Sequence, residues 1–488
     1  MDRTPSIGSF SSSALDSASL HVIGIDGVER LSQLYEFHVR LRRDEPLTED
    51  DLTDALLAPC ALALGPGDDD VVKGIAREVS VVEAVEGRPA VYEFVVVPTV
   101  WLLTVSRVSR VYQSMSVKDM AADVLGRYSL SGGEHFELRI TASAKRELCV
   151  QYQESDWDFL QRWFEHEGFF YWFEHSDSGE KLVVSDSNDM TKPIPGESSS
   201  LPYRDVGALN RPTESVFQWR SVQRRIPARV VLKDYNDQKP LLAVVGRADV
   251  KAKGGFGTFY EYGDHFDAPA AGNALAQKRA ERLLVERLTL SGVTDCTRVH
   301  VGHTFTLTDH YEGAQNREYL ITAIEHHLGR IDDAREQGAV GYRARFRAIP
   351  KSVQYRPERK TPWPSIHGLM HGHVDSASSG KFSTLDEQGR YRVRFPFDTS
   401  GKTGEESSPW VRMAQPYSGA GYGSHHPLHK GTEVLLAFLD GDPDRPIIVG
   451  TVPNAVTPGP STSANATQSR VRTASGIEIT MDDSVSKG

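Results

Sequence analysis

Three aspartates at alternate positions offer the first candidate for chemistry. In the stretch FLDGDPDRPIIVG, Asp440, Asp442 and Asp444 occupy positions one, three and five of a calcium-loop pattern. Such a loop also needs glycine at position six for a sharp turn and a bidentate glutamate at position twelve. Here those positions hold Arg445 and Thr451. The stretch therefore predicts a β-hairpin whose Asp-Pro pair occupies the first two positions of a tight turn.

Seventeen histidines raise the question of a metal site. In HGLMHGH, His371 and His373 project from the same side of a predicted strand, with His367 nearby, and a second group lies in HHPLH. Neither group has the HExxH spacing, and the glycines argue against a helix that holds the ligands. The sequence favours surface or interface histidines and predicts no metal site and no cofactor.

Signatures of catalysis and nucleotide binding are not matched. The sequence has no GxSxG elbow, and its glycine runs SGAGYGS and KGGFGTF do not fit phosphate-binding loops. Glu165 and Glu167 flank an aromatic cluster, as a glycosidase pair could, but they point to different faces of a helix. We therefore expect solvated charges there. The aromatic residues between 157 and 172 have helical and strand spacing, which favours a core over stacking on sugars or bases.

Composition limits the class of protein. The 488 residues suggest about three domains, and the chain has no apolar run long enough to span a membrane. The N-terminus lacks the apolar core of a secretory signal, so we expect synthesis in the cytoplasm and export by another route. The cysteines, Cys60, Cys149 and Cys296, are predicted to be buried thiols. A formal charge of −11 opposes general affinity for nucleic acid.

Helices are few and have clear boundaries. SVKDMAADVLGRY has Ser116 as a predicted N-cap, and ESDWDFLQRWFEHEG begins with a cap at Ser155 and ends at Gly168. A third helix is predicted at about 270–288 from its stripe of alanine and leucine. Most of the remaining pattern predicts strands in barrels rather than βαβ units. In GRYRVRFPFD, aromatic and aliphatic residues alternate inward with outward arginines.

Six segments in a fixed order carry a family resemblance. They are LSQLYEFHVRL, PTVWLLTVSRVSRVYQSMSVKDMAADVL, YQESDWDFLQRWFEHEGFFYWFEH, GRYRVRFPFD, SPWVRMAQPYSGAGYGS and GTEVLLAFLDGDPDRPIIVGTVPN. Together they resemble the VgrG spike proteins of type VI secretion, which are related to the hub and spike proteins of contractile-phage baseplates. The sequence departs from the family at HPLHKGTEV, where a Pro-Arg pair is usual, and it stops where the family's long needle begins.

The resemblance implies a mainly β fold, with a hub of β-barrel subdomains and a few helices, an OB-fold barrel and the start of a trimeric β-helical needle. The implied divisions are a flexible tail at 1–18, a phage-hub-like region at 19–360, an OB domain at 361–455, and a linker with the first needle strand at 456–488. The implied partners are two further copies, an Hcp-type tube protein, a PAAR-type tip protein, baseplate components and effectors. Neither nucleic acid nor stable membrane insertion is expected.

Two patterns predict where subunits meet. EVLLAFL is apolar at consecutive positions, as expected for a strand buried on both faces. The last strand, in GIEITMDD, has no partner strand after it. The predicted interface residues are Val434, Leu436, Phe438, Ile477 and Ile479. Two alternatives stay open at this stage: a spike-linked enzyme, which would need a catalytic insertion, and an OB-type module that binds nucleic acid or sugar.

Overall fold

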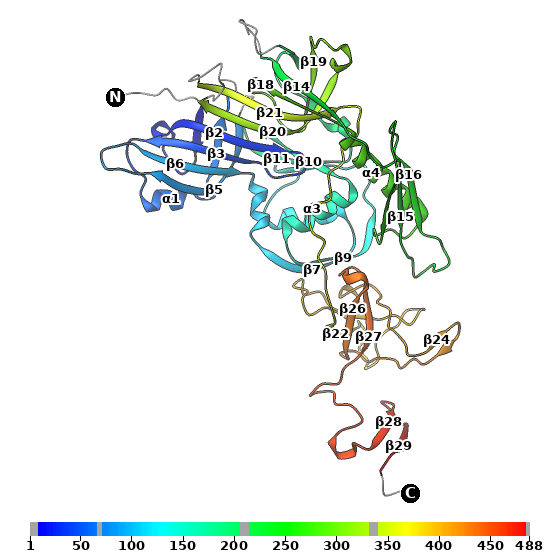
Figure 1. The fold of residues 1–488 in the computed structure, drawn as a ribbon. Helices are drawn as coiled ribbons and strands as arrows, with labels where there is room; N and C mark the ends of the chain where they lie inside the picture. The colour runs from blue at the N-terminus through cyan, green and yellow to red at the C-terminus, as the bar shows by residue number, and fades with distance from the viewer. Residues whose placement is uncertain (1–7, 66–70, 205–213, 331–339, 485–488) are drawn as a thin grey trace. The chain divides into compact units, whose positions relative to one another are not determined.

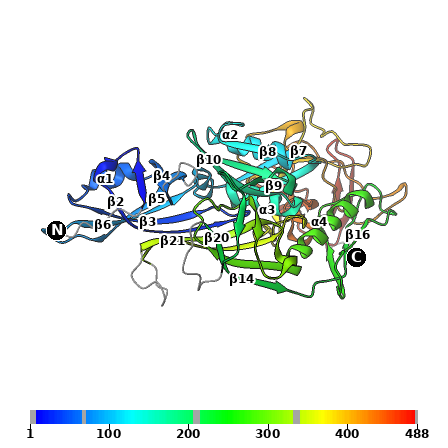
Figure 2. The ribbon, with the colours of Figure 1, turned by 90° about the horizontal axis from the view of Figure 1, so that it is seen from above.

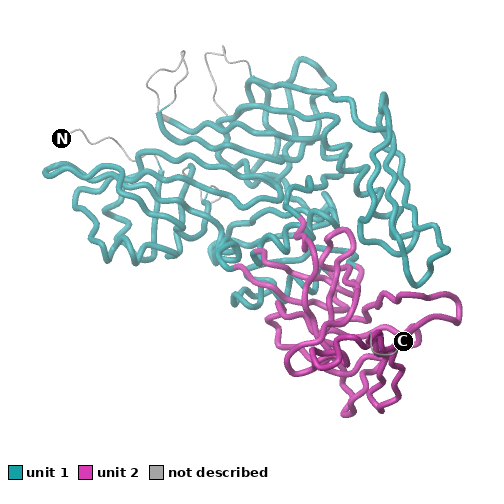
Figure 3. Tube along the Cα trace, turned by 60° about the horizontal axis from the view of Figure 1, so that its bottom comes forward, with its two compact units in different colours: residues 1–106, 117–143, 155–362 teal, residues 107–116, 144–154, 363–488 magenta. Residues whose placement is uncertain are grey.

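The computed structural model describes residues 8–65, 71–204, 214–330 and 340–484, in which strands dominate (Figure 1). The chain forms two compact units (Figure 3). Unit 1 contains residues 1–106, 117–143 and 155–362, and unit 2 contains residues 107–116, 144–154 and 363–488. Within the described ranges, no helix is both long and apolar enough to cross a membrane.

Unit 1 is built on one large sheet, in which thirteen strands pair among the described residues. The strands are β1 (Ser9–Ser12), β2 (His21–Arg30), β3 (Glu36–Arg43), β4 (Pro59–Ala63), β5 (Val71–Glu83), β6 (Ala90–Val97), β12 (Lys192–Pro193), β13 (Ser200–Pro202), β14 (Val216–Gln223), β18 (Leu288–Thr294), β19 (His303–Thr308), β20 (Glu318–Arg330) and β21 (Val340–Pro350). The main path is β1-β4-β5-β6-β3-β2-β20-β21-β18-β14. The antiparallel pair β2 and β20 therefore joins an early half of the sheet to a late half (Figures 1 and 2).

The N-terminal prediction needs a correction. Residues 1–18 were expected to be a flexible tail, yet Ser9–Ser12 pairs with β4 as an edge strand. Phe10 anchors this strand, because its ring is buried and the centroid of that ring lies 5.2 Å from the ring centroid of Phe94. A single aromatic residue in a serine-rich stretch gives little periodic signal, so only the contact with the sheet reveals the strand.

Helix α3 (Asp156–Glu167) forms where its capping signals predict it. Unit 1 contains α1 (Glu49–Ala55), α2 (Val117–Arg127), α3 (Asp156–Glu167) and α4 (Pro269–Arg287). The Ser155 hydroxyl accepts the Asp158 N–H at 3.0 Å, and Gly168 ends α3 in the left-handed conformation at φ 69°. A polar cap and a C-terminal glycine satisfy backbone groups that a helix end otherwise leaves unpaired.

Two small sheets complete unit 1. The first consists of β8 (Phe136–Arg139), β10 (Phe170–Ser176) and β11 (Gly179–Ser185), and the second of β15 (Arg229–Lys233), β16 (Val245–Asp249) and β17 (Thr258–Tyr262). Helix α4 packs on β16 (Figure 1). The approach is close because Gly246 faces Gly272, and a Cβ on Gly246 would lie 2.1 Å from the Gly272 carbonyl oxygen.

Unit 2 contains a small closed barrel. Its strands are β22 (Met370–Asp375), β23 (Arg392–Arg394), β26 (Glu433–Phe438) and β27 (Pro446–Thr451), paired in the order β23-β22-β26-β27. Isolated bridges from Val411 to Tyr391 and from Met413 to Ile448 connect the two ends of this path. Unit 2 also contains β7 (Arg107–Ser116), β9 (Lys145–Ser155), β24 (Ser418–Gly419), β25 (Tyr422–Gly423), β28 (Gln468–Arg472) and β29 (Glu478–Asp482).

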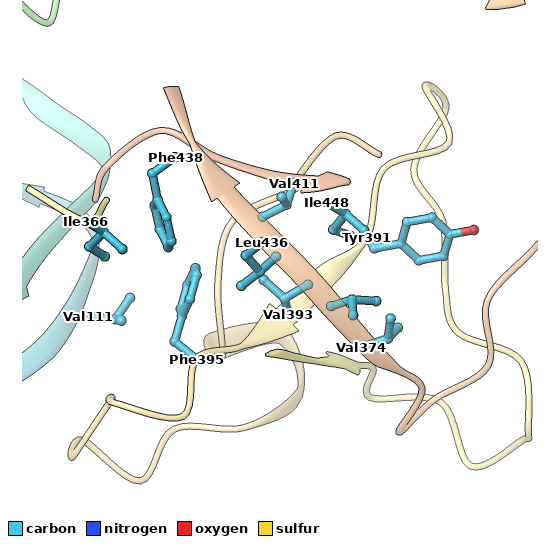
Figure 4. Close-up of a cluster of buried hydrophobic side chains, with 11 residues drawn as sticks. Val111, Ile366, Val374, Tyr391, Val393, Phe395, Val411, Leu436, Phe438 and Ile448 are labelled. Carbon is cyan, nitrogen blue, oxygen red and sulfur yellow. The ribbon is translucent and has the colours of Figure 1, made fainter. Parts of the chain in front are cut away.

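Strand β26 supplies the centre of the barrel core. Its side chains alternate between half-buried and buried, and Val434, Leu436 and Phe438 belong to the buried core. Leu436 and Phe438 lie there with Val393 and Ile448 (Figure 4). The sequence predicted burial on both faces, whereas the outward residues of the strand are only half-buried within this chain. The predicted hairpin to β27 is confirmed.

Strands β7 and β9 belong to unit 2, although the sequence placed their residues in the region 19–360. Val111 of β7 joins the barrel core, and its N–H donates to the Asp398 carboxylate at 3.2 Å. The N–H of Val150 in β9 donates to the Asp444 carboxylate at 2.5 Å. These contacts link residues nearly 300 positions apart, which local periodicity cannot indicate.

The inward position of Leu436 gives a stability test. Leu436→Ala should lower the free energy of unfolding of unit 2 by about 2–5 kcal/mol, because it leaves a cavity in a closed core. Leu435→Ala, on the half-buried outer face of the same strand, should cost clearly less. Denaturant unfolding followed by tryptophan fluorescence measures both variants. Equal losses would contradict the inward assignment.

Candidate assembly surface and buried polar clusters

The C-terminal hairpin exposes an apolar face. Strands β28 and β29 pair antiparallel, with Val471 opposite Ile479. Side chains two positions apart on a strand share a face, so Ile477 and Met481 lie on the same side as Ile479. The exposed fraction is 48% for Val471, 71% for Ile477, 63% for Ile479 and 60% for Met481. The hairpin therefore carries a continuous apolar surface that the described residues of its own chain leave exposed.

The opposite face of the hairpin is polar. Arg470 forms an ion pair with Glu478, and the Gln468 side-chain amide donates to Asp482 at 3.1 Å. The turn between the strands closes when the Gly476 N–H donates to the Thr473 carbonyl at 3.0 Å. The sequence predicts one strand without a partner here, whereas the structure forms a two-stranded hairpin. The short turn signal TASG, with glycine at φ 93°, marks the reversal.

The five predicted interface residues separate into two groups. Val434, Leu436 and Phe438 fill the core of their own barrel, whereas Ile477 and Ile479 are exposed on the hairpin. Their part in a subunit contact stays a prediction. The exposed pair is available to a second chain, because its burial within its own chain is slight.

The aspartate-rich stretch has structural roles in unit 2. The Arg445 N–H donates to the Asp442 carbonyl at 3.0 Å, so Asp442 and Pro443 occupy the first two positions of the turn, as predicted. The Asp442 carboxylate accepts the Asp444 N–H at 3.0 Å, and Asp444 accepts the Val150 N–H. Their carboxylates thus satisfy backbone donors inside the unit.

The predicted surface histidines lie at the barrel surface. His371 is exposed, and its Nδ1 lies 2.6 Å from the Glu433 carboxylate. His425 stacks on Tyr391, with ring centroids 6.1 Å apart and an interplanar angle of 7°. Among the described residues, neither histidine belongs to a group of metal-ligand atoms that converge on one point.

Glu165 was predicted to be a solvated charge and is buried instead. One of its oxygens accepts the N–H groups of Lys360 and Thr361 at 2.8 and 2.9 Å, and the other accepts the Thr361 hydroxyl at 2.9 Å. Glu167 pairs with Lys278 at 3.0 Å. The aromatic residues around them are buried, which confirms the core prediction. Glu165 therefore holds the segment that follows β21, whereas Glu167 pairs with α4.

A second buried carboxylate, Asp264, lies among basic side chains. It contacts Arg359 at 2.8 Å, Arg279 at 3.1 Å and His166 at 3.3 Å. Burial alone raises the pKa of Asp264, but the hydrogen bond from His166 and the nearby positive charges outweigh burial and hold that pKa well below its usual value. The carboxylate therefore stays ionised at neutral pH and neutralises α4 and the segment after β21.

A third cluster escaped the sequence analysis. Glu29 of β2, His326 of β20 and His300 before β19 are all buried, and their ligand atoms lie within 4.8 Å of one another. Glu29 Oε1 lies 2.7 Å from His300 Nδ1 and 2.9 Å from His326 Nε2. The three residues are separated by up to 297 positions in the sequence, so no motif connects them. The short runs HVGH and EHH were the only local signals.

Two known protein families match long parts of this chain. Residues 28–331 match the phage tail baseplate hub family, and residues 382–452 match the type VI secretion system/phage-baseplate injector OB domain. The type VI spike protein VgrG1a of Pseudomonas aeruginosa is 31% identical over 463 residues, which cover 92% of this chain and 70% of that protein. This chain belongs to the VgrG spike family. The fold and family predicted from the sequence are thereby confirmed.

Other relatives show how much of a VgrG protein this chain spans. VgrG1c of Pseudomonas aeruginosa is 32% identical over 468 residues, which cover 92% of this chain and 62% of that protein. The actin cross-linking toxin VgrG1 of Vibrio cholerae is 31% identical over 386 residues, which cover 76% of this chain and 34% of the toxin. The chain thus spans between about a third and 70% of these relatives.

Solved structures share the fold of this VgrG chain. An E. coli type VI secretion component, c3393, which itself resembles the T4 phage tail proteins gp27 and gp5, gives a TM-score of 0.66 at 21% identity over 91% of this chain and 99% of its own. A chain of a Francisella PdpA–VgrG complex gives a TM-score of 0.62 at 8% identity over 98% of this chain and 83% of its own. At these identities the likeness establishes the fold.

The hydrogen bond to Asp444 can be tested against its neighbour. Asp444→Ala should destabilise unit 2 by about 1–3 kcal/mol, because it leaves the buried Val150 N–H without an acceptor. Asp440→Asn, at an exposed left-handed position, should be nearly neutral. Thermal unfolding with and without calcium measures both effects. A calcium-induced rise in melting temperature that Asp444→Ala removes would support the rejected calcium site.

Asp264 gives a pH test. A carboxylate whose pKa is depressed in the folded state adds stability above its unfolded pKa of about 4, and that stability is lost as the pH falls further. Asp264→Asn should therefore cost about 3–5 kcal/mol at pH 7 and less at low pH. Asp267→Asn, an exposed change nearby, serves as the control. A difference from wild type that does not change between pH 3 and 7 would contradict this role.

Proposed function

We propose that this chain is the hub and OB portion of a homotrimeric type VI secretion spike, which caps the secretion tube, punctures a target envelope and carries effectors without catalysis of its own. Membership of the VgrG family supports the role in secretion. The observation that carries the trimer is the exposed apolar face of the β28–β29 hairpin.

The exposed apolar face of the hairpin is energetically unfavourable in a single chain. A two-stranded hairpin is marginally stable by itself in water, and an uncovered row of large aliphatic side chains adds to its cost. Copies of the same hairpin around a threefold axis would cover Ile477, Ile479, Val471 and Met481 with one another. Closed symmetry also removes the free strand edges that a single copy exposes. The polar face, with Arg470 and Glu478, stays in solvent in this arrangement.

The proposed partners follow from the family. The match to a baseplate hub supports docking of unit 1 on an Hcp-type tube protein and on baseplate components. Beyond the hairpin we place a PAAR-type tip protein. A VgrG solved in complex with PdpA and a relative named as an actin cross-linking toxin support a role in carrying effectors. We propose synthesis in the cytoplasm, assembly on the apparatus, and delivery outside the cell or into a target cell.

The enzymatic alternative has no support from the buried carboxylates described above. Glu165 and Asp264 are both saturated by backbone groups or cations, so neither is available to a substrate. The nucleic-acid alternative predicts salt-dependent binding of single-stranded DNA by the OB barrel. A titration at two salt concentrations tests it, and we expect no saturable binding.

The trimer is tested with a matched pair on β29. Ile479 and Thr480 are neighbours whose side chains point to opposite faces of the hairpin. Ile479→Asp should abolish assembly, because it places a charge in the proposed apolar contact. Thr480→Asp, on the polar face, should leave assembly unchanged. Light scattering of the 488-residue chain should give three times the 54.0 kDa chain mass for wild type and Thr480→Asp.

A secretion assay extends the test to function. In a strain that lacks its own spike protein, wild type and Thr480→Asp should restore release of the tube protein, and Ile479→Asp should not. A monomeric wild type, or a trimeric Ile479→Asp, would overturn the interface. Loss of toxicity through one polar substitution, with assembly and tube release intact, would instead show that the chain is an enzyme.

A further inference from the structure

We propose that Glu29, His300 and His326 bind one zinc-type divalent transition-metal ion in the interior of unit 1. All three side chains are buried, and their ligand atoms converge to within 4.8 Å of one another. One carboxylate oxygen and two imidazole nitrogens form a ligand set that protein zinc sites use. The site depends only on unit 1, so it is independent of the proposed trimer.

The sheet register places two of the ligands. His326 lies opposite Gly27 in the β2–β20 pair, and Glu29 is two residues further along β2. Opposite residues and residues two apart share a face, so Glu29 and His326 are diagonal neighbours on one side of the sheet. Gly27 admits the ring of Phe37 beside His326, because a Cβ on Gly27 would lie 2.2 Å from that ring, and the Phe37 and His326 ring centroids are 5.3 Å apart.

The third ligand comes from a tight turn. The His303 N–H donates to the His300 carbonyl at 3.3 Å, and Gly302 adopts φ 82° inside this turn. A Cβ on Gly302 would lie 2.4 Å from the ring of Trp172, so the turn requires glycine on two grounds. This turn directs His300 toward Glu29, with Nδ1 and Oε1 2.7 Å apart.

Outer contacts orient the ligands, as they do in metal sites. The Tyr342 hydroxyl lies 2.7 Å from Nδ1 of His326, which leaves Nε2 directed at the cluster. The Val301 N–H donates to the second oxygen of Glu29 at 3.3 Å. Such partners set the tautomer of a ligand histidine and the direction of its ring.

A further buried histidine, His303, lies next to the cluster but outside the group of converging ligand atoms. The Nδ1 atom of His303 is buried and makes no hydrogen bond within the described part of the chain. Its ring centroid lies 6.4 Å from that of His300. A tetrahedral ion would take a water molecule as its fourth ligand, or His303 after a rearrangement of its side chain.

The contact distances demand only a small adjustment. A tetrahedral zinc holds its ligand atoms about 3.3 Å apart, so the Glu29 contacts would lengthen by roughly half an ångström on binding. The same contacts also suit two imidazole N–H groups that share one carboxylate oxygen. A bound ion predicts that the purified protein contains metal, whereas hydrogen bonds to a shared oxygen predict that it contains none. Metal content can be measured directly.

The experiment uses the full chain, purified without a histidine tag, incubated with zinc chloride and desalted. Elemental analysis should find about one zinc per chain, and X-ray absorption at the zinc edge should show nitrogen and oxygen ligands without sulfur. Chelation should lower the melting temperature, and zinc should restore it. His326→Gln and Glu29→Gln should each reduce retained zinc roughly tenfold or more.

His327→Gln is the matched control. His327 is the next residue on β20, but it lies on the exposed face, paired with Asp26 at 2.7 Å. This variant should retain the zinc of wild type. If the two ligand variants fail to fold, visible absorption of cobalt-loaded wild type, and its loss on adding zinc, decides the question without them. The proposal would be overturned if wild type retained no zinc, or if folded ligand variants retained as much zinc as wild type. Glu29, His300 and His326 would then be joined by hydrogen bonds alone.

Discussion

The antiparallel pairing of β2 with β20 is the constraint on which unit 1 depends. It aligns Ile25 with Leu328 and Arg30 with Ala323, across almost 300 residues of chain. Strands before residue 98 and strands after residue 287 become one sheet only through this pair. Closing so long a loop has a large entropic cost, so the junction must be strongly specified. The buried cluster of Glu29, His300 and His326 lies at this junction and joins β2 to β20 through polar contacts.

The OB barrel depends on a comparable long-range contribution. Strands β7 and β9 come from the early half of the sequence, yet they complete the barrel unit. Val111 packs in the barrel core, and Asp398 and Asp444 accept N–H groups from these strands. Residues 363–488 alone would lack both contributions. The chain therefore crosses between the two units several times, and neither unit corresponds to one continuous segment.

Carboxylates of the kind found in active sites have structural contacts here, either with backbone N–H groups or with arginines. Asp444 accepts an N–H of β9, Glu165 accepts two N–H groups after residue 359, and Asp264 neutralises two arginines. A buried carboxylate is tolerated when donors or cations compensate it, because its desolvation is otherwise too costly. The same arrangement removes these groups from contact with a substrate. The apolar face of the C-terminal hairpin, in contrast, is exposed to solvent.

The sequence by itself determined the local features: the mainly β fold, the capped helix from Ser155 to Gly168, the Asp-Pro hairpin and the family. These depend on neighbouring residues, whose spacing and turn chemistry are visible in a linear string. Only the tertiary structure decided which face of β26 is the core, that β7 and β9 join the barrel, and that Glu29 meets His300 and His326. Such contacts arise between segments distant in the chain, and strand alternation shows that two faces differ without showing what each one meets.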